Sequence, residues 1–149
     1  EESILSALST ASLNTIRQEM PDALLGQIQL WLAPEDEDLN KTQISSFQKL
    51  GLGALLPFVQ DPAFENLPQV YTLIKPLLQD SVKVLRPYLL DLLLTLAGRS
   101  SQEVAYLLRS LLEKGPTAHT IWLARRTIDA LPPESQARLQ LLISPRKEE

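Results

Sequence analysis

Apolar residues recur at intervals of three and four along most of the chain, and prolines and glycines interrupt them every ~10 to 18 residues. No segment alternates apolar and polar residues with the period of two that is typical of a strand. The pattern predicts an all-α fold of seven or eight short helices. The predicted helices cover residues 3–20, 22–32, 42–50, 52–60, 68–97 (with breaks or kinks near Pro76 and Pro87), 100–114, 117–131 and 133–143.

Helix ends are predicted mainly from glycine and proline. Pro21 disfavours helical geometry at the residue before it and ends the first helix. Gly51, Gly98 and Gly115 follow apolar periodic segments, where glycine commonly caps a helix. We therefore expect a helix to stop at each of these glycines.

Helix starts are predicted from residues that cap the free backbone amides of the first turn. Thr42 and Thr117 precede periodic segments, as N-cap residues do. Ser100 and Glu103 have the spacing of a capping box, in which each side chain accepts a hydrogen bond from the other residue's amide. These residues predict helix starts near residues 42, 100 and 117.

The chain length predicts a single all-α domain over residues 1–149, since 149 residues suffice for one continuous core. A polar run at residues 33–42 is expected to be a solvated acidic loop, and residues 144–149 a frayed tail. Helices recur about every 18 residues from Asp80 onward, roughly half a helical-hairpin repeat. This rhythm predicts either a HEAT/armadillo-like stack of hairpins or an irregular helical bundle.

Composition supports a helical, soluble protein. Leucine supplies 32 of the 149 residues while aromatic residues are 5%, and leucine loses little rotamer freedom in a helix. The longest apolar stretch, residues 88–97, contains Asp91 and is too short to span a membrane. Because the sequence begins at Glu1, we interpret it as a fragment or a processed product, with a cytoplasmic location as the default expectation.

Charge is unevenly distributed along the chain. Residues 1–70 carry 3 basic and 10 acidic groups, whereas residues 71–149 carry 11 basic and 8 acidic groups. The halves either complement each other or present different faces to partners. The total of −4 argues against a nucleic-acid partner, which a much stronger basic excess would indicate.

The segment 117–131 contains the first candidate site. His119, Trp122 and Arg126 fall three and four residues apart and so share one stripe of a helix. We expect this stripe to be partly exposed, with Ile121, Ala124, Ile128 and Leu131 facing the core. An arginine beside an indole, with Arg125 next to it, favours binding of an anionic or aromatic group of a protein partner. The alternative is structural: Trp122 packs on a helix, Arg126 lies across it and Arg125 pairs with Asp129.

The acidic loop is the second candidate contact region, and its exposed carboxylates are Glu35, Asp36, Glu37 and Asp38. Asp36, Asp38 and Asn40 match the first ligand positions of an EF-hand loop. The match then fails, because Lys41 replaces the required glycine and Phe47 replaces the bidentate glutamate. We therefore expect no bound metal.

A polar track interrupts the apolar segment 88–97. Tyr88, Asp91 and Thr95 share one stripe of a helix that is otherwise apolar and is expected to be central. An unpaired buried carboxylate is costly, so we expect the track in the core to meet solvent, a polar cavity or a basic group. A structural use is favoured over a catalytic one.

Catalytic chemistry has no motif in this sequence. The chain has one histidine and no cysteine, and it lacks a nucleophile elbow, a dinucleotide fingerprint and a phosphate-binding loop. We expect a non-enzymatic helical protein–protein interaction domain without a cofactor, a module or subunit of a larger protein or complex. The alternative is a carrier in which proline-kinked helices surround an apolar ligand such as a lipid or pigment.

Overall fold

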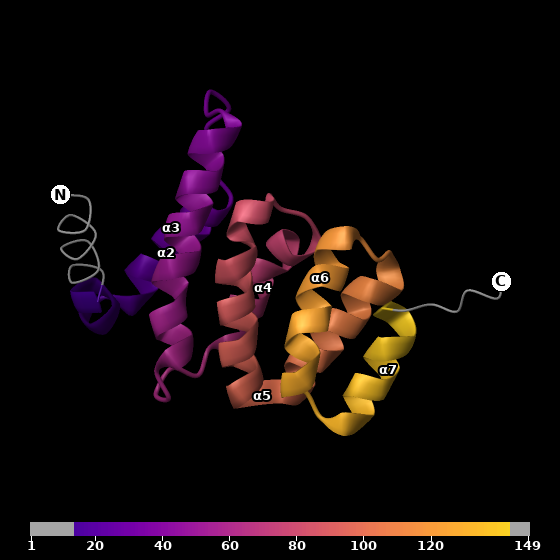
Figure 1. Cartoon of the computed structure of the whole chain (residues 1–149). Coiled ribbons are helices and arrows are strands. Elements are labelled where there is room, and N and C mark those ends of the chain that lie inside the picture. The colour runs from indigo at the N-terminus through magenta and orange to yellow at the C-terminus, as the bar shows by residue number, and fades with distance from the viewer. Residues whose placement is uncertain (1–13, 144–149) are drawn as a thin grey trace. The chain divides into compact units, whose positions relative to one another are not determined.

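The computed structural model describes residues 14–143, which form helices, two 3-10 turns and connecting loops without a strand (Figure 1). The all-α prediction is confirmed, whereas the HEAT/armadillo-like stack stays a prediction. The expected helical segment 3–13 and the tail 144–149 lie outside the described residues. After helical residues 14–19, the elements are α2 (Pro21–Leu32), α3 (Lys41–Gln60), α4 (Leu67–Gln79), η1 (Lys83–Leu85), α5 (Arg86–Lys114), α6 (Ala118–Thr127), η2 (Ile128–Ala130) and α7 (Pro133–Ile143).

The chain divides into two compact units, Glu1–Leu73 and Ile74–Glu149. The division falls inside α4, so the first part of this helix belongs to one unit and its last part to the other. Two compact units occur both within one domain and as two domains. A single domain over residues 1–149 therefore stays a prediction.

In the first unit, α2 packs against α3. Both helices bury apolar side chains, and those in the core are Leu24, Leu25, Ile28, Leu32, Leu52, Leu55, Phe58 and Val59. Gly51 lies where the helices approach closely: a Cβ at this position would be 2.8 Å from Leu32 Cδ2. The predicted helix end at Gly51 is wrong, because the glycine serves helix contact and α3 continues through it to Gln60.

The start of α3 also differs from the prediction. Asn40, rather than Thr42, is the N-cap: its Oδ1 accepts from the Gln43 amide at 2.8 Å, and Gln43 Oε1 accepts from the Asn40 amide at 2.9 Å. This reciprocal pair satisfies two amides that have no partner within the helix. Helix α3 therefore starts at Lys41, one residue before the predicted cap.

Two prolines lie inside helices. Pro57 is in α3, and α4 runs past Pro76 to Gln79, so no break occurs at Pro76. A proline inside a helix costs about 3 kcal/mol. Buried neighbours on both sides, such as Ile74 and Leu78 around Pro76, supply packing that offsets this cost. The break predicted near Pro87 is confirmed, since α5 starts at Arg86 with Pro87 in its first positions.

In the second unit, α5 packs against α6 and α7 (Figure 1), as well as against both 3-10 turns. The predicted end at Gly98 is wrong by two residues: α5 is kinked at Ser100, whose φ of −155° and ψ of 68° are not helical. Ser100 Oγ donates to Glu103 Oε1 at 2.6 Å, so the pair lies at the start of the second segment of α5, but this bond joins the two side chains and the predicted capping box through the backbone amides stays a prediction.

Helices α6 and α7 follow the sequence prediction closely. Thr117 is the N-cap of α6 and forms a capping box with Thr120. Gly115 is the C-cap of α5, and α7 covers the predicted residues, Pro133–Ile143. Helix α6 ends at Thr127 instead of Leu131, because the chain tightens into η2.

Within residues 14–143, no helix combines the length and apolar character that crossing a membrane requires.

Candidate functional site

The orientation of α6 decides which of its side chains face outward. His119 is buried at 6% exposure, Trp122 is half-buried, and Arg125 and Arg126 are exposed. The prediction that His119 shares an exposed stripe with Trp122 and Arg126 is wrong for the histidine. Ile121, predicted to face the core, is half-exposed, while the buried face consists of His119, Thr120, Leu123, Ala124, Thr127 and Ile128.

His119 is held by hydrogen bonds on both ring nitrogens. Arg86 Nε lies 3.2 Å from Nδ1 and has only a hydrogen to donate, so Nδ1 accepts. On the other side, Nε2 lies 2.8 Å from the Leu77 carbonyl oxygen, which only accepts, and 3.1 Å from Ser81 Oγ. These partners require a neutral imidazole with its proton on Nε2.

The protonation equilibrium agrees with this assignment. Burial lowers the pKa of His119 below its ordinary value of 6.5. The hydrogen bond to the Leu77 carbonyl opposes this decrease, the Arg86 guanidinium adds to it, and the Asp80 carboxylate opposes it. The histidine is thus a neutral anchor that joins the start of α6 to Leu77 and Arg86.

Trp122 lies beside two guanidinium groups. Arg126 Cζ is 3.9 Å from the centre of the indole ring, and Arg86 Cζ is 5.3 Å from it. Both distances allow cation–π attraction, worth about 0.5 to 1 kcal/mol per contact at an exposed site. Arg86 therefore contacts the buried histidine and the half-buried tryptophan together.

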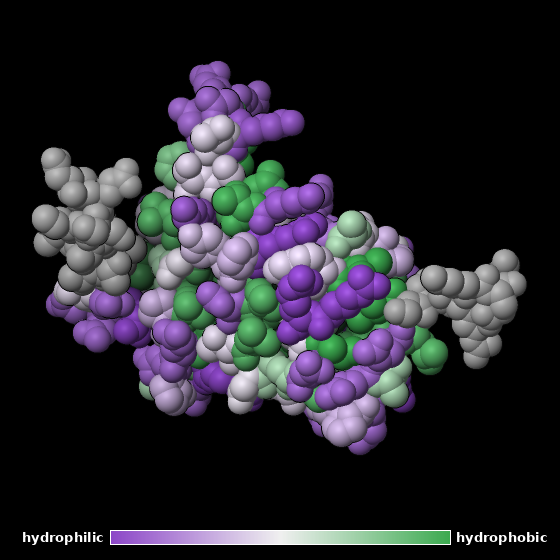
Figure 2. All heavy atoms as spheres, in the orientation of Figure 1, coloured by the Kyte–Doolittle hydropathy of each residue, from purple (hydrophilic) through white to green (hydrophobic). Residues whose placement is uncertain are grey.

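These side chains border a hollow of about 400 Å³ at the surface of the second unit. We name its charged and aromatic lining the Trp122 surface: Lys83, Arg86, Trp122, Arg125 and Arg126. The remaining lining residues are Ala118 and Ile121, so no carboxylate of residues 14–143 lines the hollow. Figure 2 shows strongly hydrophilic side chains beside hydrophobic ones over the region of α6. The arrangement suits a negatively charged group that also has apolar contacts.

The structural alternative for this segment holds in part. Arg126 does lie across Trp122, and its Nη1 is 3.5 Å from the Trp122 carbonyl oxygen. In the part of the chain from residue 14 to residue 143, however, Arg125 forms no ion pair with Asp129. The positive charge of Arg125 is therefore not neutralised by the partner that its spacing predicts.

The acidic loop connects α2 with α3 in the first unit. Glu35, Asp36, Glu37 and Asp38 are all exposed, and Figure 2 shows this end of the α2–α3 pair as hydrophilic. Asp36 Oδ1 accepts from the Asp38 amide at 2.9 Å, which stabilises the turn. The loop ends at Asn40, two residues before the predicted limit.

The predicted polar track lies at the surface of α5 and not within its core. Asp91 is exposed, Thr95 and Tyr88 are half-buried, and Thr95 Oγ1 donates to the Asp91 carbonyl oxygen at 2.7 Å. The core-facing positions of this segment are leucines: Leu89, Leu92, Leu93 and Leu96. Water solvates the Asp91 carboxylate, so the track needs no buried partner.

Two cations of the Trp122 surface were missed by sequence reasoning. Lys83 and Arg86 precede Trp122 by more than 35 residues in the printed sequence, and no helical spacing relates them to it. The tertiary packing of η1 and the start of α5 beside α6 brings them there. A local signal existed only for the members on α6.

Among the described residues, no three His, Asp or Glu side chains lie close enough together to hold a metal ion. Comparison of the chain with protein-family models, with curated proteins and with solved structures found no match.

Proposed function

We propose that this chain is a non-enzymatic helical interaction domain whose Trp122 surface binds an acidic segment of another protein. The observation that supports it is the grouping of four cations around one half-exposed tryptophan without a carboxylate in the lining. Tryptophan and arginine are the residues most enriched among those that dominate protein–protein binding energy.

The buried His119 explains how the side chains of the Trp122 surface are held in place before a partner binds. Arg86 is fixed by His119, and Arg126 is fixed against the indole. Side chains already held in place lose less conformational entropy when a partner binds. An acidic segment would place a carboxylate near Arg125 and Arg126 and an apolar side chain on Trp122.

The acidic loop is a second contact region of opposite charge. Its four exposed carboxylates suit a basic patch on the same partner or on another subunit of a larger assembly. The net charge of −4 makes a protein segment a better candidate than nucleic acid for the Trp122 surface. The alternative of an apolar-ligand carrier has less support, because the hollow beside Trp122 is lined by cations.

The test is a titration of the full chain with a fluorescein-labelled hexaglutamate peptide, read by fluorescence anisotropy. Hexaglutamine is the neutral peptide control, and a single-stranded oligonucleotide of similar charge is the competing class. We expect binding of hexaglutamate that weakens at least ~ten-fold when Arg125→Gln and Arg126→Gln are combined. Trp122→Ala is expected to weaken it by a similar factor.

The matched control combines Lys75→Gln with Lys114→Gln, two lysines of the second unit that do not line this hollow. It removes the same charge from the same unit but leaves the Trp122 surface intact. Equal weakening by both double variants would mean non-specific attraction and would refute the proposal. Tighter binding of the oligonucleotide than of the peptide would refute the choice of partner. Circular dichroism checks that each variant keeps its helical content.

A further inference from the structure

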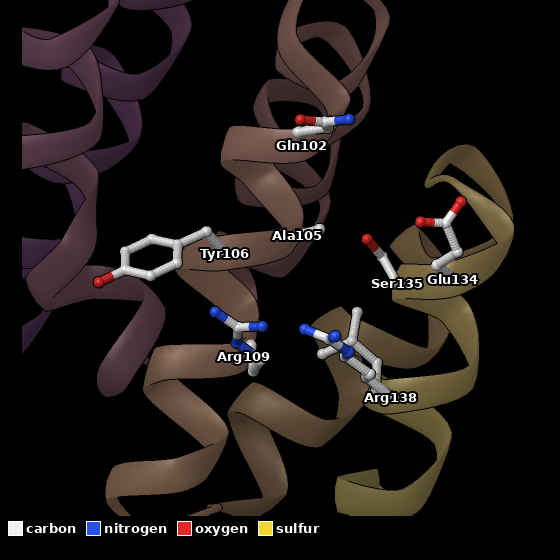
Figure 3. Close-up of a pocket in the computed structure, with 8 residues that line it drawn as sticks. Gln102, Ala105, Tyr106, Arg109, Glu134, Ser135 and Arg138 are labelled. Atoms are coloured by element: carbon white, nitrogen blue, oxygen red, sulfur yellow. The ribbon is translucent and has the colours of Figure 1, made fainter.

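A second hollow, of about 260 Å³, lies in the second unit between α5 and α7 (Figure 3). Arg109 on α5 and Arg138 on α7 line it, together with the Ser135 hydroxyl group and the Glu134 side chain. In Figure 3 the two guanidinium groups point toward each other across the hollow, and Ser135 lies on α7 at its edge. The Glu134 carboxylate also lines the hollow, farther from the two guanidinium groups than Ser135. Two guanidinium groups and one hydroxyl group therefore line one space.

The two guanidinium groups face each other without a direct ion-pair partner among the described residues, although the Glu134 carboxylate lines the same hollow. Within the described part of the chain, neither Arg109 nor Arg138 forms an ion pair with a carboxylate. Like charges repel, so an anion between them would relieve an unfavourable interaction. Arg109 is half-buried, and its Cζ lies 5.4 Å from the centre of the Tyr106 ring, a contact that helps to hold its orientation.

We propose that this hollow binds the phosphate group of a phosphate monoester. Such a group carries nearly two negative charges at neutral pH and presents three acceptor oxygens in a tetrahedral arrangement. Two guanidinium forks on opposite sides of a gap each engage a different pair of these oxygens, and the Ser135 hydroxyl donates to the group as well. A carboxylate has both oxygens in one plane and occupies a single fork.

The size and charge of the hollow agree with a compact anion. Its volume is below the ~300 to 1,000 Å³ typical of sites for drug-sized ligands. Ser135 and Glu134 lie in the first turn of α7, where the helix dipole favours negative charge. The negative charge of Glu134 lies in the same favourable field and repels a bound anion, so removal of this charge should strengthen anion binding. This site is independent of the Trp122 surface and does not rest on the function proposed above.

The experiment titrates the ¹⁵N-labelled full chain with inorganic phosphate at pH 7.5 and constant ionic strength, with acetate as the carboxylate control. Arginine Nε–Hε resonances and the Ser135 amide report the site. We expect phosphate to shift Arg109, Arg138 and Ser135 together, and acetate to bind at least ~ten-fold more weakly. Glycerol 3-phosphate and a phosphoserine peptide then distinguish a small-molecule ester from a phosphorylated protein side chain.

Substitutions make the result specific to the hollow. Arg138→Gln and, separately, Arg109→Gln should weaken phosphate binding about ten-fold, and Arg138→Lys should also weaken it, because lysine lacks the fork. Glu134→Gln should strengthen binding at least ~two-fold. Arg125→Gln, on the Trp122 surface, should leave it unchanged. Absence of shifts at Arg109 and Arg138, or equal weakening by Arg125→Gln and Arg138→Gln, would overturn the proposal.

Discussion

The two units use their polar side chains differently. In the first unit, Asn40 and Gln43 cap α3, Gln48 Nε2 donates to the Leu32 carbonyl, and Arg17 pairs with Asp61 at 3.3 Å. In the second unit, five arginines line two hollows, and none has a carboxylate as ion-pair partner among residues 14–143. Arg109 and Arg138 line one hollow, and Arg86, Arg125 and Arg126 line the other.

This difference indicates that an anionic ligand would gain the most binding free energy in the second unit. A polar group that already forms hydrogen bonds or ion pairs within its own unit has little remaining capacity to bind a ligand. A cation without an ion-pair partner is instead stabilised electrostatically when an external anion binds beside it. The acidic loop is the exception in the first unit. Its carboxylates are exposed, and within the described residues only Asp36 among them accepts a hydrogen bond that stabilises the structure, from the Asp38 amide in the turn. The following predictions test this contrast, and each unit has its own reporter, Trp31 in the first and Trp122 in the second.

The largest effect is expected at the buried anchor of the second unit. His119→Ala leaves the Leu77 carbonyl and Arg86 Nε without their partners and creates a small void. We expect the free energy of unfolding to fall by about 2 to 3 kcal/mol, measured by urea denaturation with Trp122 fluorescence. The control Arg125→Gln should change it by less than ~0.5 kcal/mol. A comparable change in both variants would mean that His119 is not an anchor.

In the first unit, two glycines of α3 form a matched pair. Gly51→Ala places a methyl group against Leu32 and Trp31, whereas nothing lies within 4 Å of a Cβ at Gly53. We expect Gly51→Ala to destabilise by about 1 kcal/mol, since overpacking outweighs the gain in helix propensity. Gly53→Ala should stabilise by about 0.5 to 1 kcal/mol. Urea denaturation followed by Trp31 fluorescence measures both, and equal effects would contradict the close helix contact.

A smaller effect is expected at the start of α3. Asn40→Ala removes the cap that satisfies the Gln43 amide and should lower the free energy of unfolding by about 1 kcal/mol. Glu37→Ala, in the neighbouring loop, should change it by less than ~0.5 kcal/mol. If Glu37→Ala proved the more destabilising of the two, the acidic loop would have a structural role that its exposure does not indicate.

The smallest effect is a pH dependence confined to the second unit. The folded-state pKa of His119 is lower than its ordinary value of 6.5, so the unfolded chain binds a proton more readily. The stabilising contribution is complete above pH 6.5 and is lost as the pH falls from there toward the folded-state pKa. We expect a lower free energy of unfolding at pH 5.5 than at pH 7.5, and a smaller difference in His119→Gln. An unchanged difference in that variant would assign the dependence to other groups.

Predictions of helix limits from single residues are correct where the residue affects only the adjacent turn of the helix. Thr117, Gly115 and Pro87 mark helix limits correctly because capping and proline geometry involve only the adjacent turn. The helix end predicted at Gly51 and the break predicted near Pro76 are both wrong, because burial and packing outweigh local preference. At Gly51 the close contact with Leu32 decided the outcome, and at Pro76 the burial of Ile74 and Leu78 offsets a cost of about 3 kcal/mol from local preference.

The candidate site shows the same division. Trp122, Arg125 and Arg126 were recognised because they are neighbours on one helix, and Arg126 lies over the indole as their spacing of four indicates. His119 was assigned to the wrong side, because its position between the stripes leaves the choice to the surrounding helices. Arg109 and Arg138 had no signal, since their shared hollow exists only where α5 and α7 meet.

By itself the sequence determined the helical class, most helix starts in the second unit and the uneven distribution of charge. These follow from periodicity, capping and composition, which act over a few residues. Only the tertiary structure decided that His119 is buried, that Lys83 and Arg86 join Trp122, and that two arginines face each other between α5 and α7. Each of these depends on contacts between residues far apart in the chain, which the local pattern does not encode.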